Sequence, residues 1–316
     1  MNSADLAGTM SRRNGAAVDD DRTGYPPTVF LMANEFATGG TEKQFIILAR
    51  ALQRAKFNLC LGCIRRRGSL SDALGAEPIA EFPLDGGVAT ATSLLSARAL
   101  ARYLRRHHVT VAHSFSFYSN LLMIPIARLA GVPVVIGSQQ QLGDLLTPRQ
   151  RYVQQTCFRL CDRVVCNSRA SAELVFGPRL ANEKVVIIPN AVSPEFFRTG
   201  EARPSPKTTT GTVGLIGRMN TRAKKHEPFL RAAARLSGQL PSTQFLLVGD
   251  GPLLNELEQL AQNLGIASRV SFLGERTDVS DILTRLDILA LTSSSESSPN
   301  EIGEAMPAGV PVVATV

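Results

Sequence analysis

Two carboxylates eight residues apart, Glu296 and Glu304, stand in the stretch SSSESSPNEIGEAMPAGVPVVAT near the end of the sequence. The spacing around them predicts a loop, a short helix that begins with a capping box of Ser298 and Glu301, and then a buried strand. Open backbone N–H groups at a helix start favour a phosphate, whereas two acids repel phosphate and favour neutral hydroxyl groups. The stretch therefore suits a ligand that carries a diphosphate and several hydroxyl groups, and a nucleotide sugar is such a ligand.

The short helix is also expected to bury one face. Ile302, Ala305 and Met306 recur at helical spacing and predict an apolar stripe, and Gly309 is placed to end the helix. Pro307 removes a backbone donor from the last turn, so the position of the helix end is harder to predict. An ordinary amphipathic helix with two solvated acids is the alternative interpretation of the stretch.

The same residues resemble the E-x7-E signature of the retaining glycosyltransferases of family four, which have the GT-B fold. In that family the stretch reads roughly S-x-x-E-G-x-P-x-x-x-x-E-A-M-A-x-G-x-P-V-V-A-T. The sequence departs from this pattern at Ser297, where the family favours glycine, and at Pro307, where it favours alanine. The positions that match in register are Glu296, Pro299, Glu304, Ala305, Met306, Gly309 and 311–315.

A basic loop in the second half of the sequence extends the resemblance. TVGLIGR predicts a strand that ends at Gly217 and Arg218, and Lys224 and Lys225 follow just before a helix. The family reads G-R-L, a short loop and then K-G-x-x-x-L, with the arginine and the lysine bound to the donor diphosphate. The resemblance therefore implies charge-assisted contacts from Arg218 and Lys224 to diphosphate, with Lys225 in place of the glycine. A solvated basic loop is the alternative.

The resemblance also implies roles for the residues between and including the two acids. Glu296 is expected to face the transferred sugar and to act in catalysis, and Glu304 to accept hydrogen bonds from the ribose hydroxyls. Asn300 and Glu301 belong to the same expected donor-binding set. Catalysis would be mainly electrostatic, because positive groups would stabilise the charge on the departing diphosphate, so no metal or other cofactor is expected.

A double-glycine turn marks a second candidate site. An apolar run at 28–34 predicts a buried strand, and Gly39 and Gly40 follow it and open a helix. Such a turn brings backbone N–H groups to the carboxyl end of the strand, where open α/β sheets bind ligands. The turn also resembles the G-G-x-E turn of the same glycosyltransferases, which implies that Gly39 and Gly40 line the acceptor and diphosphate side of the pocket.

His113 ends the strand pattern VTVAHSF at the same edge of the expected sheet. A lone histidine at such a place is commonly a structural hydrogen-bonding group, and that is the alternative to a catalytic role. The resembling family often carries H-x-H here, which favours the catalytic role. This sequence keeps the first histidine and has Phe115 in place of the second, so the role of the second cannot be carried over.

Alternating strand and helix patterns predict an α/β protein with two doubly wound parallel sheets. Together with the resemblance they predict a GT-B fold, in which two Rossmann-like domains face a cleft. The strands expected in the first domain lie at 28–34, 58–64, 78–84, 109–115, 132–138, 163–168 and 185–189.

The expected domain limits follow from composition. We expect a disordered tail at 1–25, an acceptor-side domain at 26–195, a linker at 196–211 and a donor-binding domain at 212–316. The linker segment is rich in Pro, Thr and charged residues. The second domain shows five strand patterns and the sequence stops at the last, whereas the family continues. We therefore expect the second domain to be incomplete.

Composition excludes several classes of protein. The 316 residues are 44% hydrophobic and 19% charged with a formal net charge of +7, which describes a globular protein. The sequence has no apolar run of eighteen residues, no secretory signal pattern and no nucleic-acid-binding module. A cytoplasmic protein is expected. The basic cluster Arg98, Arg102, Arg105, Arg106, His107 and His108 would attract any anionic partner, and a solvated helix face is the bland interpretation. Because many enzymes of the resembling family act on lipid-linked acceptors, the resemblance implies peripheral contact with an anionic membrane at its inner face.

Metal binding is not expected from the cysteines or from the acidic D-x-D pattern. Cys60 and Cys63 have C-x-x-C spacing, but they lie in an apolar strand pattern and no second pair accompanies them. The five cysteines are expected to be free thiols in a reducing compartment. Asp19 and Asp21 form a D-x-D pattern within the expected tail, far from any strand end.

The resemblance implies a retaining, hexosyltransferase-type enzyme. It would transfer a sugar from a nucleotide diphosphate donor to a hydroxyl of a saccharide or lipid-linked acceptor, in polysaccharide, glycolipid or cell-envelope biosynthesis. A catalytically inactive fragment that binds nucleotide sugars is the first alternative. A GT-B sugar-nucleotide epimerase is the second, and it is disfavoured because the E-x7-E run belongs to transferases.

Overall fold

The structure is a computed structural model that describes residues 26–75, 77–84, 90–177, 184–197 and 211–315. The expected tail at 1–25, with Asp19 and Asp21, and most of the expected linker lie outside the described residues. Within the described ranges, no helix is both long and apolar enough to cross a membrane.

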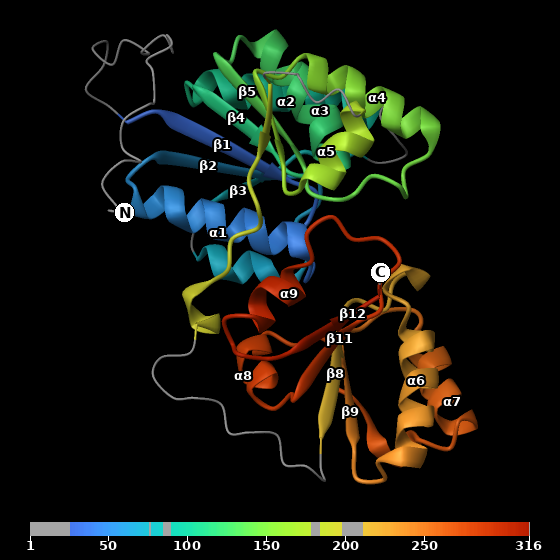
Figure 1. Cartoon of the computed structure of the whole chain (residues 1–316). Helices are drawn as coiled ribbons and strands as arrows, with labels where there is room; N and C mark the ends of the chain where they lie inside the picture. Colours follow the sequence, from blue (N-terminus) through green and yellow to red (C-terminus); the bar gives the residue numbers. More distant parts are fainter. Residues whose placement is uncertain (1–25, 76, 85–89, 178–183, 198–210, 316) are drawn as a thin grey trace, which may run out of the picture.

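Seven parallel strands form the first sheet, in the order β3-β2-β1-β4-β5-β6-β7 (Figure 1). Strand β1 pairs on both sides, so Phe30 lies opposite Cys60 of β2 and Ala112 of β4. The strands are β1 (Thr28–Ala33), β2 (Asn58–Cys63), β3 (Ile79–Glu81), β4 (Val111–Ser114), β5 (Val134–Gln139), β6 (Arg163–Cys166) and β7 (Val185–Ile187). The helices of this part are α1 (Gly40–Arg54), η1 (Ser69–Leu74), α2 (Ala91–Arg106), α3 (Phe117–Ala130), α4 (Pro148–Arg159) and α5 (Arg169–Phe176).

Five parallel strands form the second sheet, in the order β10-β9-β8-β11-β12. This sheet lies below the first in Figure 1, and the first turn of α1 faces α9 where the two parts meet. The strands are β8 (Thr212–Ile216), β9 (Gln244–Val248), β10 (Val270–Phe272), β11 (Ile288–Leu291) and β12 (Val312–Ala314). The helices are η2 (Pro194–Phe196), η3 (Arg222–Lys224), α6 (His226–Gln239), α7 (Leu254–Asn263), η4 (Ala267–Arg269), α8 (Val279–Thr284) and α9 (Asn300–Ala305).

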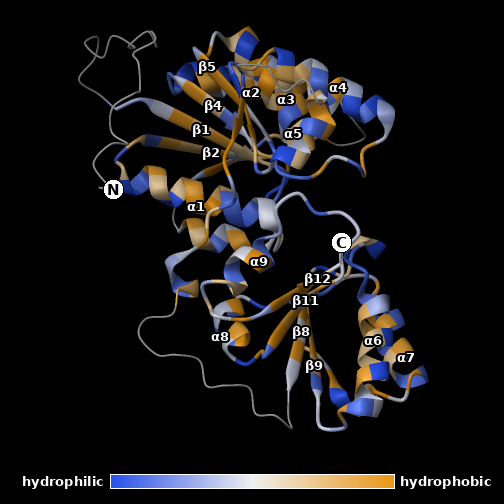
Figure 2. Ribbon diagram, in the orientation of Figure 1, coloured by the Kyte–Doolittle hydropathy of each residue, from blue (hydrophilic) through white to orange (hydrophobic). Residues whose placement is uncertain are grey.

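The inner strands of each sheet are buried on both faces, which explains why they are mostly apolar runs (Figure 2). In β1, Val29 and Leu31 pack with α1, whereas Phe30 and Met32 pack with α2 and α3 on the opposite face. In β9 the alternation is the same, with one set of side chains against α6 and α7 and the other against α8 and α9. Both sheets are therefore doubly wound, and the predicted α/β fold with two Rossmann-like units is confirmed.

The helix of the E-x7-E stretch differs from the expectation. Its N-cap is Pro299 and no side chain caps it, so the predicted capping box is wrong, because the Glu301 carboxylate instead accepts a hydrogen bond from Lys224. Met306 is 69% exposed and does not extend the apolar stripe to which Ala305 belongs. The helix ends at Ala305, before Pro307, so the missing proline donor interrupts no helical hydrogen bond. Gly309 completes the turn beyond it with a left-handed φ of 71°.

Candidate functional site

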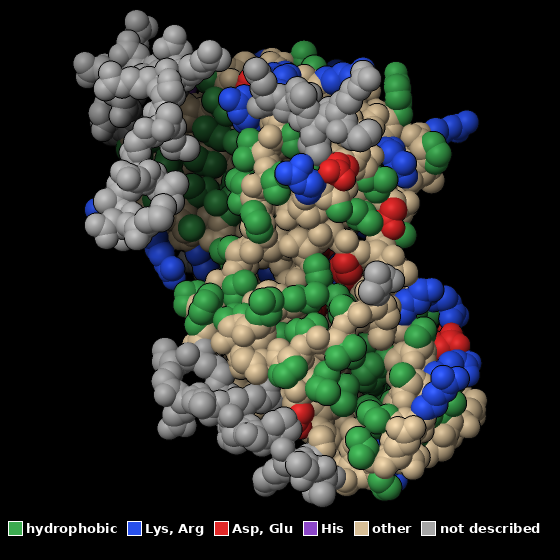
Figure 3. Space-filling model, in the orientation of Figure 1, with side chains coloured by type: hydrophobic (Ala, Val, Ile, Leu, Met, Phe, Trp, Pro, Cys, Tyr) green, Lys and Arg blue, Asp and Glu red, His purple; other side chains and the backbone are tan. Residues whose placement is uncertain are grey.

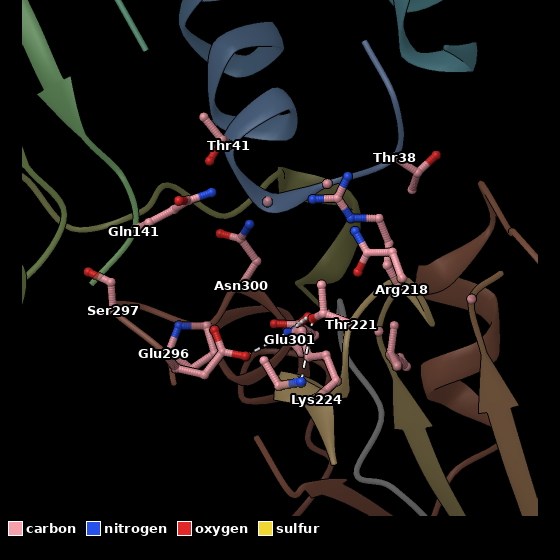
Figure 4. A pocket seen from close by; sticks show the side chains of 18 of the residues that line it. Thr38, Thr41, Gln141, Arg218, Thr221, Lys224, Glu296, Ser297, Asn300 and Glu301 are labelled. Atoms are coloured by element: carbon pink, nitrogen blue, oxygen red, sulfur yellow. Dashed lines mark hydrogen bonds and ion pairs between the residues drawn. The ribbon is translucent and has the colours of Figure 1, made fainter. Parts of the chain in front are cut away.

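A cavity of about 380 Å³ lies between the two sheets, and residues from both halves of the chain line it. The lining segments follow the carboxyl ends of β1, β5, β8, β9, β10 and β11, the edge at which open α/β sheets bind ligands. Figure 4 shows Lys224, Glu296 and Glu301 grouped together, with Asn300 and Arg218 nearer the start of α1. Among the residues expected from the sequence, the lining includes Gly39, Gly40, Arg218, Lys224, Glu296, Asn300 and Glu301.

The double-glycine turn touches the opposite half of the molecule. A Cβ added at Gly39 would lie 2.3 Å from the Glu42 Oε2 atom and 3.1 Å from the Arg218 Nη2 atom. A Cβ added at Gly40 would lie 2.5 Å from the Asn300 Nδ2 atom. Neither glycine has a left-handed φ, so the glycines matter here for the close approach of these side-chain ends and not for backbone conformation.

Arg218 extends from the end of β8 toward the start of α1 (Figure 4). Glu42, in the first turn of α1, is buried beside it. Burial raises the pKa of the Glu42 carboxyl, and the positive charge of Arg218 opposes this rise. Arg218 thus brings a permanent positive charge to the part of the cavity where the start of α1 meets the second sheet.

Lys224 binds two carboxylates in the cavity. Its Nζ atom lies 2.6 Å from the Glu296 Oε1 atom and 2.9 Å from the Glu301 Oε1 atom (Figure 4). Burial disfavours the charged form of Lys224, but the two acids outweigh this effect and raise its pKa. An ammonium group has three N–H donors, so one stays available beside these two contacts. Lys224 therefore orients Glu296 and Glu301 within the site.

The structure separates the two acids of the E-x7-E stretch. Glu296 lines the cavity from the loop before α9, at partial exposure. Glu304 is only 5% exposed, is not among the lining residues, and accepts a hydrogen bond of 2.7 Å from Lys43 of α1. Lys43 lines the cavity, and nothing in the sequence patterns singled it out.

The loop that carries Glu296 is held by side chains of the first half of the chain. The Ser295 hydroxyl donates to Asp144 Oδ1 at 2.6 Å. The Ser297 hydroxyl lies 2.9 Å from the Ser168 hydroxyl and also donates to Asn167. Ser297 replaces a glycine of the family pattern, so this sequence adds contacts between the two halves that glycine cannot make.

The first turn of α9 is held in the same way. Asn190 donates from its Nδ2 atom to the Ser298 carbonyl and to the Asn300 Oδ1 atom, each at 2.8 Å. Gln44 of α1 donates to the same Asn300 oxygen at 3.1 Å. No local spacing pattern points to these contacts of Gln44 and Asn190, because their partners are more than 100 residues away in the chain.

His113 is not brought to the cavity. It is 8% exposed at the end of β4, its Nε2 atom lies 2.7 Å from the Ser138 hydroxyl, and its ring lies against Phe115. Burial lowers the pKa of His113 to about 4, so the ring is neutral near pH 7. This placement favours the structural alternative, and a catalytic role stays a prediction that the geometry does not support.

We expect His113 to make stability depend on pH. Its pKa falls from 6.5 to about 4 on folding, so the unfolded chain binds a proton between these pH values that the folded protein excludes. The free energy of unfolding should therefore decrease as pH falls from 6.5 toward 4. Urea unfolding at pH 7 and pH 5 should show a loss about 2 kcal/mol larger in the parent than in a His113→Asn variant. Equal losses would contradict the buried neutral ring.

The cysteines contribute no feature of this site. All five are free, and burial raises the pKa of Cys63, Cys161 and Cys166 to about 12. Among the residues that the structure describes, no group of three His, Cys, Asp or Glu could hold a metal ion. The expectation that the reaction needs no metal stays a prediction.

The arrangement combines recognition of anions with recognition of hydroxyl groups. The cations Arg218 and Lys224 and the carboxylates Glu296 and Glu301 are among the charged groups that line one cavity at the carboxyl edge of parallel sheets. Comparison with protein families agrees with this geometry. The model described as Glycosyltransferase Family 4 matches residues 38–196, and the model described as Glycosyl transferases group 1 matches residues 210–316. The protein belongs to glycosyltransferase family 4 and has the GT-B fold.

Two individual relatives share about a quarter to a third of their residues with this chain over the matched parts. The chain is 25% identical over 282 residues to the Escherichia coli UDP-Gal:alpha-D-GlcNAc-diphosphoundecaprenol alpha-1,3-galactosyltransferase, a match that covers 83% of this chain and 72% of that protein. It is 32% identical over 158 residues to the Rhizobium meliloti lipopolysaccharide core biosynthesis glycosyltransferase LpsE, covering 50% of this chain and 45% of that protein. The matches thus span between about half and three quarters of the length of these two relatives.

A solved structure supports the fold independently. The complex of Anabaena Alr3699/HepE with UDP and glucose matches with a TM-score of 0.77 and 20% identity, covering 91% of this chain and 80% of that chain. At this identity the likeness shows the GT-B fold alone.

Proposed function

We propose that this chain is a retaining, hexosyltransferase-type enzyme that transfers a sugar from a nucleotide diphosphate donor to an acceptor hydroxyl. The observation that carries the proposal is the cavity between the two sheets. Arg218, Lys224 and Glu296 line this cavity, and Lys224 donates to Glu296 within it. The UDP-containing complex of the Anabaena neighbour and the UDP-Gal-dependent relative support a nucleotide sugar as donor. We further propose that the domain at 26–195 holds the acceptor and the domain at 212–316 holds the donor.

Arg218 would bind the donor diphosphate, because a guanidinium can engage phosphate oxygens at two points. The start of α1, at Gly40, faces the same cavity, and its free N–H groups would add partial positive charge. As the bond between the sugar and the diphosphate breaks, negative charge grows on the diphosphate, and fixed positive groups stabilise it. Glu296, held by Lys224, would face the sugar as positive charge develops on its ring.

The acceptor would enter past the loop that follows β5. Residues 140–146 of this loop line the cavity beside the loop that carries Glu296, and Leu145 in it is exposed. The loop presents both polar and apolar side chains to the cavity, which suits a saccharide or a lipid-linked saccharide. The acceptor of the E. coli relative, as its name states, is a GlcNAc-diphosphoundecaprenol, which supports the lipid-linked class and a place in polysaccharide, glycolipid or cell-envelope biosynthesis.

Incubation of the purified chain with a panel of nucleotide sugars, followed by proton NMR, tests the proposal. Release of a nucleoside diphosphate with transfer of the sugar, or its slow transfer to water, is the expected result. Binding without turnover would favour the inactive-fragment alternative, and interconversion of two nucleotide sugars would favour an epimerase. A first product with the opposite anomeric configuration to the donor would refute retention.

We also propose peripheral contact with an anionic membrane at the inner face, which agrees with the expected cytoplasmic location. The sequence contains no Asp or Glu between residues 86 and 143, while Arg98, Arg102 and Arg106 are exposed along α2. Leu94 and Leu95 are exposed on the same helix. Basic side chains occupy the upper edge of the molecule in Figure 3, where α2, α3 and α4 lie in Figure 1. Such a face suits a surface of anionic lipids.

Vesicle sedimentation tests this contact. Each basic residue near an anionic surface contributes about 1 kcal/mol, so Arg102→Glu with Arg106→Glu should weaken binding to phosphatidylglycerol-containing vesicles by at least about tenfold. Arg231→Glu with Arg235→Glu on α6 makes the same change of net charge elsewhere and serves as the control. Equal losses in the two double variants would show that net charge alone, and not α2, determines binding.

A further inference from the structure

Lys43 carries a contact that the mechanism above does not use. It lies in the first turn of α1, and its Nζ atom lies 2.7 Å from the Glu304 Oε1 atom of α9. The ion pair therefore joins the acceptor-side half of the chain to the donor-side half. Lys43 lines the cavity, whereas Glu304 is 95% buried next to it. A ligand in the cavity would thus meet Lys43, and a hydroxyl group that reached past it would meet the Glu304 carboxylate.

Only one oxygen of Glu304 is used in this contact. The Oε2 atom is buried and has no hydrogen-bond partner among the described residues. A buried carboxylate oxygen without a donor is costly, so its persistence calls for a functional explanation. A ribose hydroxyl is a neutral donor of the kind that such an oxygen accepts.

The surroundings of Glu304 make Lys43 necessary for its charge. Burial raises the pKa of the Glu304 carboxyl, and Lys43 opposes this rise. The other charged groups that act on it are acids, Glu301 of α9 and Glu195 of η2, and both favour the protonated form. Without the Lys43 cation, Glu304 would be a buried acid near two other acids, which favours the neutral carboxyl group.

We propose that Lys43 is a positioning residue for the donor nucleotide that acts through Glu304. It holds Glu304 as a carboxylate with Oε1 fixed and Oε2 free to accept a ribose hydroxyl. Because Lys43 and Glu304 come from opposite halves of the chain, the ribose site is complete only when the two halves are together. The inference rests on the proposed function, since it assumes that a nucleotide sugar is the ligand.

A double-mutant cycle measured by calorimetry tests the inference, with UDP-glucose and other nucleotide sugars as probes. These diphosphates are esterified at both ends, so they do not themselves titrate between pH 5 and pH 8. Lys43→Met keeps the apolar stem and removes the charge, and it should weaken binding at pH 6 about tenfold. Glu304→Gln should weaken it similarly, and the double variant should lose no more than either single variant. Lys43→Arg should restore most of the affinity.

The pH profile separates this role from a structural one. In Lys43→Met, affinity should rise toward that of the parent as pH rises and Glu304 ionises, whereas the parent and Glu304→Gln should show no such rise. The double variant contains no unpaired buried acid, so it stays informative if Lys43→Met is unstable. Additive losses would show that Lys43 contacts the ligand directly, and tighter binding by Lys43→Met would show that it competes with the ligand. Either result would overturn the inference.

Failure of the inference differs from failure of the proposed function. If the folded parent binds no nucleotide sugar, the proposed function is wrong. If the parent binds one and Lys43→Met binds it equally at every pH, the function stands and the role of Lys43 is refuted. Lys225→Met, which removes an exposed charge between η3 and α6, should leave the affinity and its pH profile unchanged.

Discussion

Replacing Lys224 by alanine is expected to weaken binding of the donor nucleotide about thirtyfold. This corresponds to about 2 kcal/mol, the free energy of one hydrogen bond to a charged group. The structure adds a second reason, because Lys224 also holds Glu296 and Glu301 at 2.6 and 2.9 Å. Without it, two carboxylates would face the diphosphate without a cation between them. Calorimetric titration with the nucleoside diphosphate measures the loss, and thermal unfolding checks that the variant is folded.

Lys225→Ala is the matched control for this prediction. Lys225 is exposed and has a left-handed φ of 53°, the conformation that glycine adopts most readily, which explains why the family has glycine at this position. The ion pairs of Glu296 and Glu301 in the described part of the chain are with Lys224, so the Lys225 variant should lose less than about threefold in affinity. A larger loss in Lys225→Ala than in Lys224→Ala would show that the wrong lysine has been assigned to the diphosphate.

Glu296→Gln and Glu304→Gln should damage different steps of the reaction. Glu296 lines the cavity and is proposed to face the sugar, so its contacts can strengthen as the sugar ring gains positive charge. Its loss should lower kcat at least about a hundredfold, which corresponds to about 3 kcal/mol of transition-state stabilisation. Glu304 is proposed to bind the ribose, which is present before and during the reaction. Its loss should mainly raise KM.

The nucleoside diphosphate product gives the clearest separation, because it keeps the ribose and lacks the sugar. Glu304→Gln should weaken its binding about tenfold, as expected for one lost charge-assisted hydrogen bond. Glu296→Gln should leave its binding nearly unchanged. Equal losses of product affinity in the two variants would contradict this division of roles, even if both variants were inactive.

The sequence was sufficient to predict the scaffold. Each strand of both sheets lies within a mostly apolar run from which a strand was predicted. Such runs are expected because a strand that is buried on two faces needs apolar side chains on both. The predicted strand at 58–64, for example, is observed as Asn58–Cys63. The double-glycine turn was also predicted, although the physical reason differs. A side chain at Gly39 would meet Glu42 and Arg218, and one at Gly40 would meet Asn300 of the second half.

The contacts that complete the site could not be predicted in the same way. Local spacing predicted that Glu301 would cap its own helix, but Lys224, more than seventy residues away, binds it instead. Lys43 and Glu304 are 261 residues apart, and no local pattern links them. Such contacts depend on how the two sheets meet, whereas periodicity and capping rules describe only neighbours along the chain.

The central claim is that the cavity between the two sheets binds a nucleotide sugar through Arg218. Calorimetric titration of the 316-residue chain with UDP-, GDP- and ADP-sugars, repeated with Arg218→Ala, tests it most directly. We expect at least one of these ligands to bind with one site per chain, and Arg218→Ala to weaken that binding at least about tenfold. A folded protein that binds none of them, or an Arg218→Ala variant that binds as tightly as the parent, would contradict the claim.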